Sequence, residues 1–153
     1  MNKILILLTI CPTLIFSQSK KILDHNAYDQ WRRVSKQIIS NDGKYIVYTT
    51  EPNGIGNKQL KLHSFDGNMV LEYEGASNPY FTNNSKYLIF RISPDLFELR
   101  DLKRKKTKEK NLPGDTLAIY SIETKRVTKI AGLKSFKVPE KWDDYVVYLY
   151  EPE

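Results

Sequence analysis

Ser77 lies in the stretch that comes nearest to the active-site motif of a serine hydrolase. That motif, Gly-x-Ser-x-Gly, places a serine on a sharp strand-to-helix turn, where its hydroxyl can meet a base. Here the chain reads Gly75-Ala76-Ser77-Asn78-Pro79, so the second glycine is missing, and strand-like segments lie on both sides. The sequence therefore predicts a turn between strands and no nucleophile.

Only two histidines could serve as a general base. His25 precedes the strand-like segments, and His63 lies within one, LKLHSF. A catalytic histidine needs a partner that orients it and a nucleophile within reach, and the neighbouring sequence provides neither. Both histidines are predicted to pack or to lie on a sheet surface, and we expect no catalytic residue.

Two short motifs could hold a phosphate or a metal ion. Residues Gly54 to Lys58 read GIGNK, but a phosphate loop needs a strand before it, a helix after it and a wider glycine spacing. Asp143 and Asp144 offer oxygen ligands for calcium, but two acids without further ligands are a weak set. The sequence predicts a hairpin loop and a turn at these places, and neither a cofactor nor a metal.

Basic residues gather in one segment, residues 100–110, which reads RDLKRKKTKEK and carries a net charge of +5. The whole chain has a net charge of +6, so the remainder is nearly balanced. Nucleic-acid binding usually requires a distributed basic face, and this pattern argues against it. A solvated helix is the favoured interpretation, and contact with an anionic surface stays as an alternative.

Residues 1–19 match a secretory signal peptide. Lys3 supplies the positive charge, Ile4 to Phe16 is a nearly unbroken apolar run, and small polar residues follow at Ser17–Ser19. Thirteen residues are too few to cross a bilayer, so no transmembrane segment is expected after removal of the signal. A secreted or periplasmic protein is predicted; a buried first strand or helix is the alternative.

Cys11 is the only cysteine and lies within this apolar run. Removal of the signal would leave no disulfide and no thiolate ligand, so burial of apolar surface must stabilise the fold. Lipid attachment at Cys11 is a weaker alternative, because the large Ile10 precedes it.

An internal repeat decides the fold class. ISNDGKYIVYTTEP begins at Ile39, and FTNNSKYLIFRISP begins at Phe81, which is 42 residues later. Two further offsets of 57 residues join LKLHSF to LAIYSI and VLEYEG to VTKIAG. A third, degraded copy ends the chain at 138–152. The longer offset places an insertion between Pro94 and Leu117, where the basic segment also lies.

The repeated segments are short, rich in Tyr, Val and Ile, and separated by Asp-Gly or Asn-Ser turns, which is typical of hairpin strands. Several are apolar on both faces, as a sheet covered on both sides requires. The sequence predicts an all-β, partial β-propeller of about two and a half four-stranded antiparallel blades and roughly ten strands, with one basic helical insertion. Trp31, Trp142 and the tyrosines are predicted to pack between the blades.

The expected boundaries follow from the repeat. They are a signal peptide at 1–19, an N-terminal arm at 20–33, a first blade at 34–74, a second blade at 79–131 and a partial third blade at 135–153. The insertion at 95–112 is predicted to be a helix that Ser93 caps and Pro94 begins. Leu96, Leu99 and Leu102 would line one side, and Asn111 and Pro113 would end it.

Motif order adds a resemblance to a known family. AYDQWRRVSKQIISNDGKYIVYT, the second SKYLIF, the Lys-rich insertion and LPGDTLAIYSIETKRVTKIAG together resemble the N-terminal propeller part of secreted bacterial prolyl oligopeptidase-family serine peptidases. The resemblance implies a propeller that caps an α/β-hydrolase domain and restricts access to short peptides. The family's catalytic Ser, Asp and His lie in that hydrolase domain, so no position of this chain matches them.

Three functions stay open at this point. The first is a non-catalytic propeller fragment of such a peptidase, with a hydrolase domain or further blades as partners and peptides as possible ligands. The second is a free-standing propeller module for binding, similar to TolB-like repeats, in the periplasm or at the cell surface. The third is binding of nucleic acid or an anionic surface through Arg100 to Lys110.

Export should remove the N-terminal segment, with cleavage near Ser17–Ser19, because the apolar run ends there and Lys20 and Lys21 follow. N-terminal sequencing of the exported protein checks this expectation. A secreted form that still begins at Met1 would contradict it.

Overall fold

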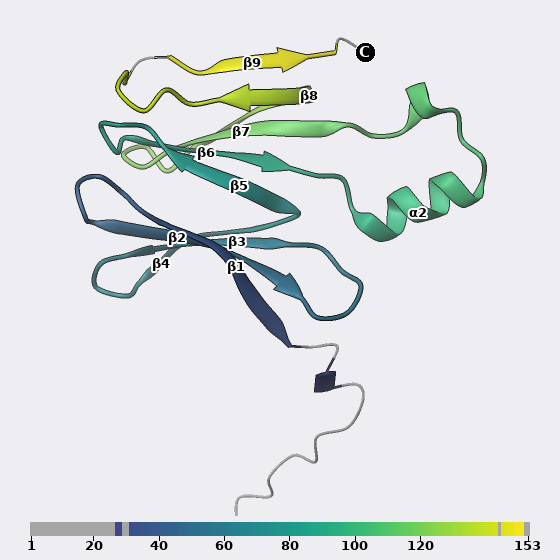
Figure 1. Ribbon diagram of the computed structural model, residues 1–153, viewed down its shortest axis with the longest axis horizontal. Helices are drawn as coiled ribbons and strands as arrows, with labels where there is room; N and C mark the ends of the chain where they lie inside the picture. Colours follow the sequence, from purple (N-terminus) through teal and green to yellow (C-terminus); the bar gives the residue numbers. More distant parts are fainter. Residues whose placement is uncertain (1–26, 29–30, 144, 152–153) are drawn as a thin grey trace, which may run out of the picture.

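The computed structural model describes residues 27, 28, 31–143 and 145–151 (Figure 1). The predicted signal peptide, Cys11, His25 and Asp144 lie outside the described residues. Within the described part, no helix is long and apolar enough to cross a membrane.

Nine strands and one α-helix make up the described chain. They are β1 (Arg32–Ile39), β2 (Tyr45–Pro52), β3 (Gln59–Ser64), β4 (Met69–Glu74), β5 (Ala76–Phe81), β6 (Tyr87–Ile92), α2 (Leu96–Arg104), β7 (Asp115–Ser121), β8 (Val127–Lys137) and β9 (Val147–Tyr150), with a short 3-10 turn at Glu109–Asn111.

The strands form two antiparallel sheets that stack on one another (Figure 1). The first sheet has the order β1-β2-β3-β4, and the second has the order β5-β6-β7-β8-β9. Every neighbour in each sheet is also the neighbour in sequence, as in a chain of hairpins. The predicted all-β partial propeller with one helical insertion is confirmed, and the second sheet carries a fifth strand beyond the four expected of a blade.

The core lies between the two sheets. Val47, Leu60 and Leu62 of the first sheet are fully buried against Leu88 and Phe90 of the second. Each such side chain stabilises the fold by about 1.5–3 kcal/mol relative to an exposed one. Strand alternation explains the choice of residues, because every second side chain of a strand points to the same face.

A single glycine joins the two sheets. Gly75 lies between β4 and β5 with a φ of 73°, a left-handed value that glycine adopts without steric cost. A side-chain carbon added there would lie 2.8 Å from the carbonyl oxygen of Ser93. The stretch that superficially resembles a nucleophile elbow is therefore the joint between two blades, and Ser77 already belongs to β5.

Gly132 repeats this joint inside β8, with a φ of 75°. Ser93 N–H donates to the Gly75 carbonyl at 2.9 Å, and Glu151 N–H donates to the Gly132 carbonyl at 2.8 Å. Up to Leu133 the strand β8 pairs with β7, and from Leu133 onward it pairs with β9. The expected partial third blade is thus joined to the second sheet through one continuous strand.

Two strand boundaries differ from the expected ones. β1 begins at Arg32, inside the expected arm, because the Arg32 guanidinium donates from Nε to the Thr50 hydroxyl at 2.9 Å and holds the strand to β2. β5 begins at Ala76, three residues before the expected start, because the glycine joint occupies one residue only.

The helical insertion begins later and ends earlier than expected. Asp95 is the N-cap in place of Ser93, because its carboxylate accepts hydrogen bonds of 2.9 Å from the N–H groups of Phe97 and Glu98. The Glu98 N–H group and, after it, the Asn57 side-chain amide hold the pKa of Asp95 below its ordinary value. The helix ends at Arg104, and Asn111 belongs to the separate 3-10 turn.

The two most similar segments of the chain form the same turn in both sheets. In the first, the Ser40 hydroxyl donates to the Asp42 carboxylate at 2.6 Å and accepts from Tyr45 N–H at 3.0 Å. In the second, the Thr82 hydroxyl donates to the Asn84 amide oxygen at 2.8 Å and accepts from Tyr87 N–H at 3.1 Å.

These turns also bind one another. The Asn41 side-chain amide donates to the Asn83 carbonyl at 2.9 Å, and Asp42 N–H donates to the Ser85 hydroxyl at 3.2 Å. Ser85 adopts a φ of 57°, where the first copy has Gly43 at 70°. The repeat in sequence is thus a repeat in structure, and its two copies meet at one edge of the stacked sheets.

When the pH is lowered from neutral to about 3, the free energy of unfolding should fall less in the Asp42→Asn variant than in wild type. The Ser40 hydroxyl holds the pKa of Asp42 below its ordinary value. The stabilisation is therefore present above the ordinary pKa and is lost as the pH falls through the lowered one. Free energies of unfolding in urea at each pH measure the difference.

Asn84→Asp is the matched variant, because it puts a carboxylate into the second copy of the same turn. It should lose more stability than wild type over the same pH range. Equal losses in all three proteins would contradict the proposed contribution of the turn.

Candidate functional site

The face of the first sheet that points away from the second sheet is open. In β2 the side chains alternate, so Val47 and Thr49 are buried whereas Ile46 is 38% exposed. Ile39 of β1 is 65% exposed, and Met69 of β4 is 50% exposed. We call this surface the outer face of the first sheet.

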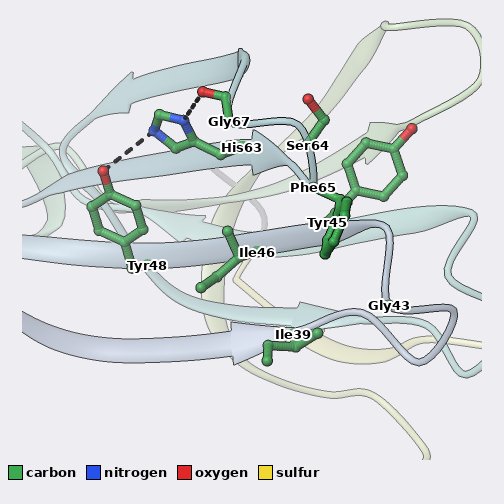
Figure 2. A pocket seen from close by; sticks show the side chains of 9 residues that line it. All are labelled: Ile39, Gly43, Tyr45, Ile46, Tyr48, His63, Ser64, Phe65 and Gly67. Carbon is green, nitrogen blue, oxygen red and sulfur yellow. Dashed lines mark hydrogen bonds between the residues drawn. The ribbon is translucent and has the colours of Figure 1, made fainter.

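A groove of about 470 Å³ lies on this outer face (Figure 2). Figure 2 shows that the ends of β1, β2 and β3 provide its side chains, with the β3–β4 turn closing one end. Apolar and aromatic groups predominate. The lining residues are Ile39, Gly43, Tyr45, Ile46, Tyr48, His63, Ser64, Phe65 and Gly67.

His63 lies in this groove and uses both ring nitrogens. Nε2 is 3.3 Å from the Tyr48 hydroxyl, and Nδ1 is 3.2 Å from the Gly67 carbonyl oxygen. The carbonyl can only accept, so Nδ1 donates to it, and in the neutral ring Nε2 then accepts from the Tyr48 hydroxyl. The two rings are also nearly parallel, with centroids 5.6 Å apart. His63 is therefore a fixed part of the sheet surface, as expected from the sequence.

Ser64 follows His63 but makes separate contacts. Its hydroxyl donates to the Asp66 carboxylate, which holds the pKa of Asp66 below its ordinary value. Ser64 and His63 both line the groove, but among the described residues no hydrogen bond joins the Ser64 hydroxyl to the His63 ring. The arrangement gives His63 no hydroxyl nucleophile from its sequence neighbour.

The GIGNK loop positions the basic helix. The Asn57 amide donates to the Asp95 carboxylate at 2.5 Å, and its oxygen accepts from Leu96 N–H at 3.0 Å. A loop that superficially resembles a phosphate loop thus binds the first turn of α2. Sequence reasoning missed Asn57, because the contact joins residues 38 positions apart.

The basic segment is exposed along its length. Leu96, Leu99 and Leu102 are half-buried on one side, in agreement with their spacing, and Phe97 is 53% exposed. All seven basic residues from Arg100 to Lys110 are exposed, as predicted for a solvated segment. Only Arg100, Lys103 and Arg104 lie on α2, and the other four follow its end, so the basic segment is less helical than predicted.

The remaining candidate residues do not form a site. Among the described residues, no group of three or more His, Cys, Asp or Glu side chains could hold a metal ion. Trp31 is 51% exposed and Trp142 is 66% exposed. The expectation that these tryptophans pack between blades is wrong for this chain, because both lie at its outer ends, where no second sheet covers them.

Comparison with solved structures identifies the architecture. The β-propeller domain of the Trilobed protease from Pyrococcus furiosus superposes with a TM-score of 0.53 and 13% sequence identity, over 78% of this chain and 34% of that one. The fold is that of consecutive propeller blades. No family model matches the chain, and no curated protein matches it.

Acylaminoacyl peptidases are similar as well. The Pyrococcus horikoshii enzyme gives a TM-score of 0.52 and 11% identity, and an acylaminoacyl peptidase in complex with Z-Gly-Gly-Phe-chloromethyl ketone gives 0.52 and 14%. Each match covers 76% of this chain and 17% of the peptidase. The propeller blades described here therefore span about a sixth of the length of those enzymes.

Asn57→Ala should loosen the first turn of α2, because it removes both hydrogen bonds to that turn, worth about 1 kcal/mol together. Amide hydrogen exchange of Leu96 to Leu99 should become several-fold faster. Asn53→Ala, in the same loop, should leave it unchanged. Unaltered exchange in the Asn57 variant would contradict the assigned role.

Proposed function

We propose that this chain is the non-catalytic propeller part of an exported prolyl oligopeptidase-like serine peptidase, and that it restricts peptide access to an α/β-hydrolase domain. The observation that carries the proposal is the pair of stacked, repeat-related blades. Their solved counterparts include a protease's β-propeller domain and acylaminoacyl peptidases. The motif order of the sequence supports the same family.

The assignment of catalysis to a different domain is supported by the hydrogen bonds of the outer face. His63 is bound by Tyr48 and Gly67, and Ser64 is bound by Asp66. A serine hydrolase needs a nucleophile, a base and an oxyanion hole preorganised together. On this proposal the hydrolase domain supplies all three, and the blades supply a wall that bulky substrates cannot pass.

Export is part of the proposal. The predicted signal peptide at 1–19 supports a secreted or periplasmic protein, in which extracellular peptides would be the substrates of the hydrolase domain.

A free-standing binding module is the second candidate, and the groove beside Tyr48 and His63 favours it. An apolar groove with a few polar groups is the usual form of a ligand site. The DNA that follows the codon for Glu153 separates the two candidates. A continuing hydrolase reading frame with Gly-x-Ser-x-Gly supports the peptidase, and further blades without that motif support the binding module.

The purified chain should not react with a fluorophosphonate probe of serine hydrolases. Among the described residues, His63 hydrogen-bonds to Tyr48 and Gly67 and to no serine that it could activate. Mass spectrometry after labelling makes the measurement, and a serine hydrolase of known activity is the positive control. Stoichiometric labelling at any serine, with Ser64 and Ser77 as the first to inspect, would overturn the non-catalytic assignment.

A further inference from the structure

The two sheets converge along their first strands. Among the strands of the second sheet, β5 comes nearest to the first sheet and lies beside β1, β2 and β3. Within the described part of the chain, β1 pairs only with β2, β5 pairs only with β6, and β8 from Ser135 onward pairs only with β9. Sheets that converge at one edge and spread at the other have the geometry of blades around a central channel. Further blades would pack on the faces of the sheets and leave these first-strand edges open to the channel.

The first strands carry positive charge and no acidic residue. β1, β5 and β8 from Leu133 onward contain five basic residues, whereas the other described strands together contain three basic and four acidic ones. Two of the five have carboxylate partners, because Arg33 lies 3.0 Å from Glu51 and Lys134 lies 3.0 Å from Glu151. Positive charge remains on the strands that face the channel. The five basic residues are Arg32, Arg33, Lys36, Lys134 and Lys137.

Side chains from three consecutive first strands meet at Lys36. The Nζ atom of Lys36 lies 4.2 Å from the centroid of the Tyr80 ring, and the Phe136 ring meets the Tyr80 ring edge-on at 5.7 Å. Tyr80 is 42% exposed. None of the described carboxylates forms an ion pair with Lys36, and a cation–π contact leaves its positive charge unneutralised. We call Lys36, Tyr80 and Phe136 the channel strip.

We propose that the channel strip binds acidic peptides, so that the channel favours substrates with carboxylate side chains. The inference rests on the proposed function, in which the blades form the wall that peptides pass. Lys36 offers a carboxylate an unpaired ammonium group, and the two aromatic rings offer apolar surface to the rest of the peptide. A basic peptide would meet only like charge on the first strands.

Peptide titrations test the proposal. The probe is an acetylated and amidated peptide of four glutamates, and the same peptide with four glutamines is its uncharged match. Backbone amide chemical shifts of the isotope-labelled chain report both affinity and location. The glutamate peptide should shift the amides of the channel strip and bind about tenfold more tightly than the glutamine peptide, because several surface charge pairs act together. Added salt should weaken this binding.

Substitutions of one lysine identify the site. Lys36→Gln should weaken binding of the glutamate peptide about threefold, the effect of one surface ion pair, and Lys36→Arg should retain it. Lys105→Gln is the matched control, since it removes the same charge from an exposed residue of the basic segment. Affinity measured at Tyr80 and Phe136 should be unchanged in this control, and circular dichroism melting should show that all three variants are folded.

Equal affinity for the two peptides would contradict the proposal. So would shifts confined to the basic segment, or a Lys36→Gln variant that binds as wild type does. These failures are distinct from failure of the proposed function, which the downstream reading frame tests. A hydrolase frame without binding of the glutamate peptide would remove this inference alone, and further blades with such binding would remove the peptidase assignment alone.

Discussion

Packing between sheets is the constraint on which the other features of this chain depend. Strands such as β2 and β6 are apolar on both faces, so a sheet covered on one side still presents apolar surface to water. Stacking a second sheet buries Val47, Leu62 and Phe90, and it leaves a new open face. A stack of such sheets always has an uncovered apolar face at each end, which is why propellers close into rings.

This constraint also explains the connecting residues. Because β4 and β5 belong to different sheets, the chain must change direction within one residue, and Gly75 provides the left-handed conformation that this requires. Asn41 and Asn83 then fix the second sheet against the first at the turns. The turns that contain Asn41 and Asn83 thus have two functions, since each closes its own hairpin and also holds the neighbouring blade in register.

The sequence was sufficient for the features that repeat, and insufficient for those that depend on a distant partner. The 42-residue and 57-residue offsets predicted the repeated strands and the position of the insertion, because each copy is under the same packing constraint. The helix cap at Asp95 depends on Asn57 in the other sheet, which no local pattern reveals. The exposure of Trp31 and Trp142 depends on which sheets are present, and the local sequence of neither tryptophan carries that information.

The differences between repeat copies are the most informative part of the sequence for function. Where the second sheet has Ala118 and Tyr120 at its buried face, the first has Lys61 and His63. Burying Lys61 unpaired would be costly, and the structure instead pairs it with Glu72 near solvent. The half of this face formed by β3 and β4 is therefore polar. The half formed by β1 and β2, with Ile46 and Tyr48, keeps the apolar character of a packing surface. That gradient identifies the inner two strands as the part of the outer face that a further sheet would cover.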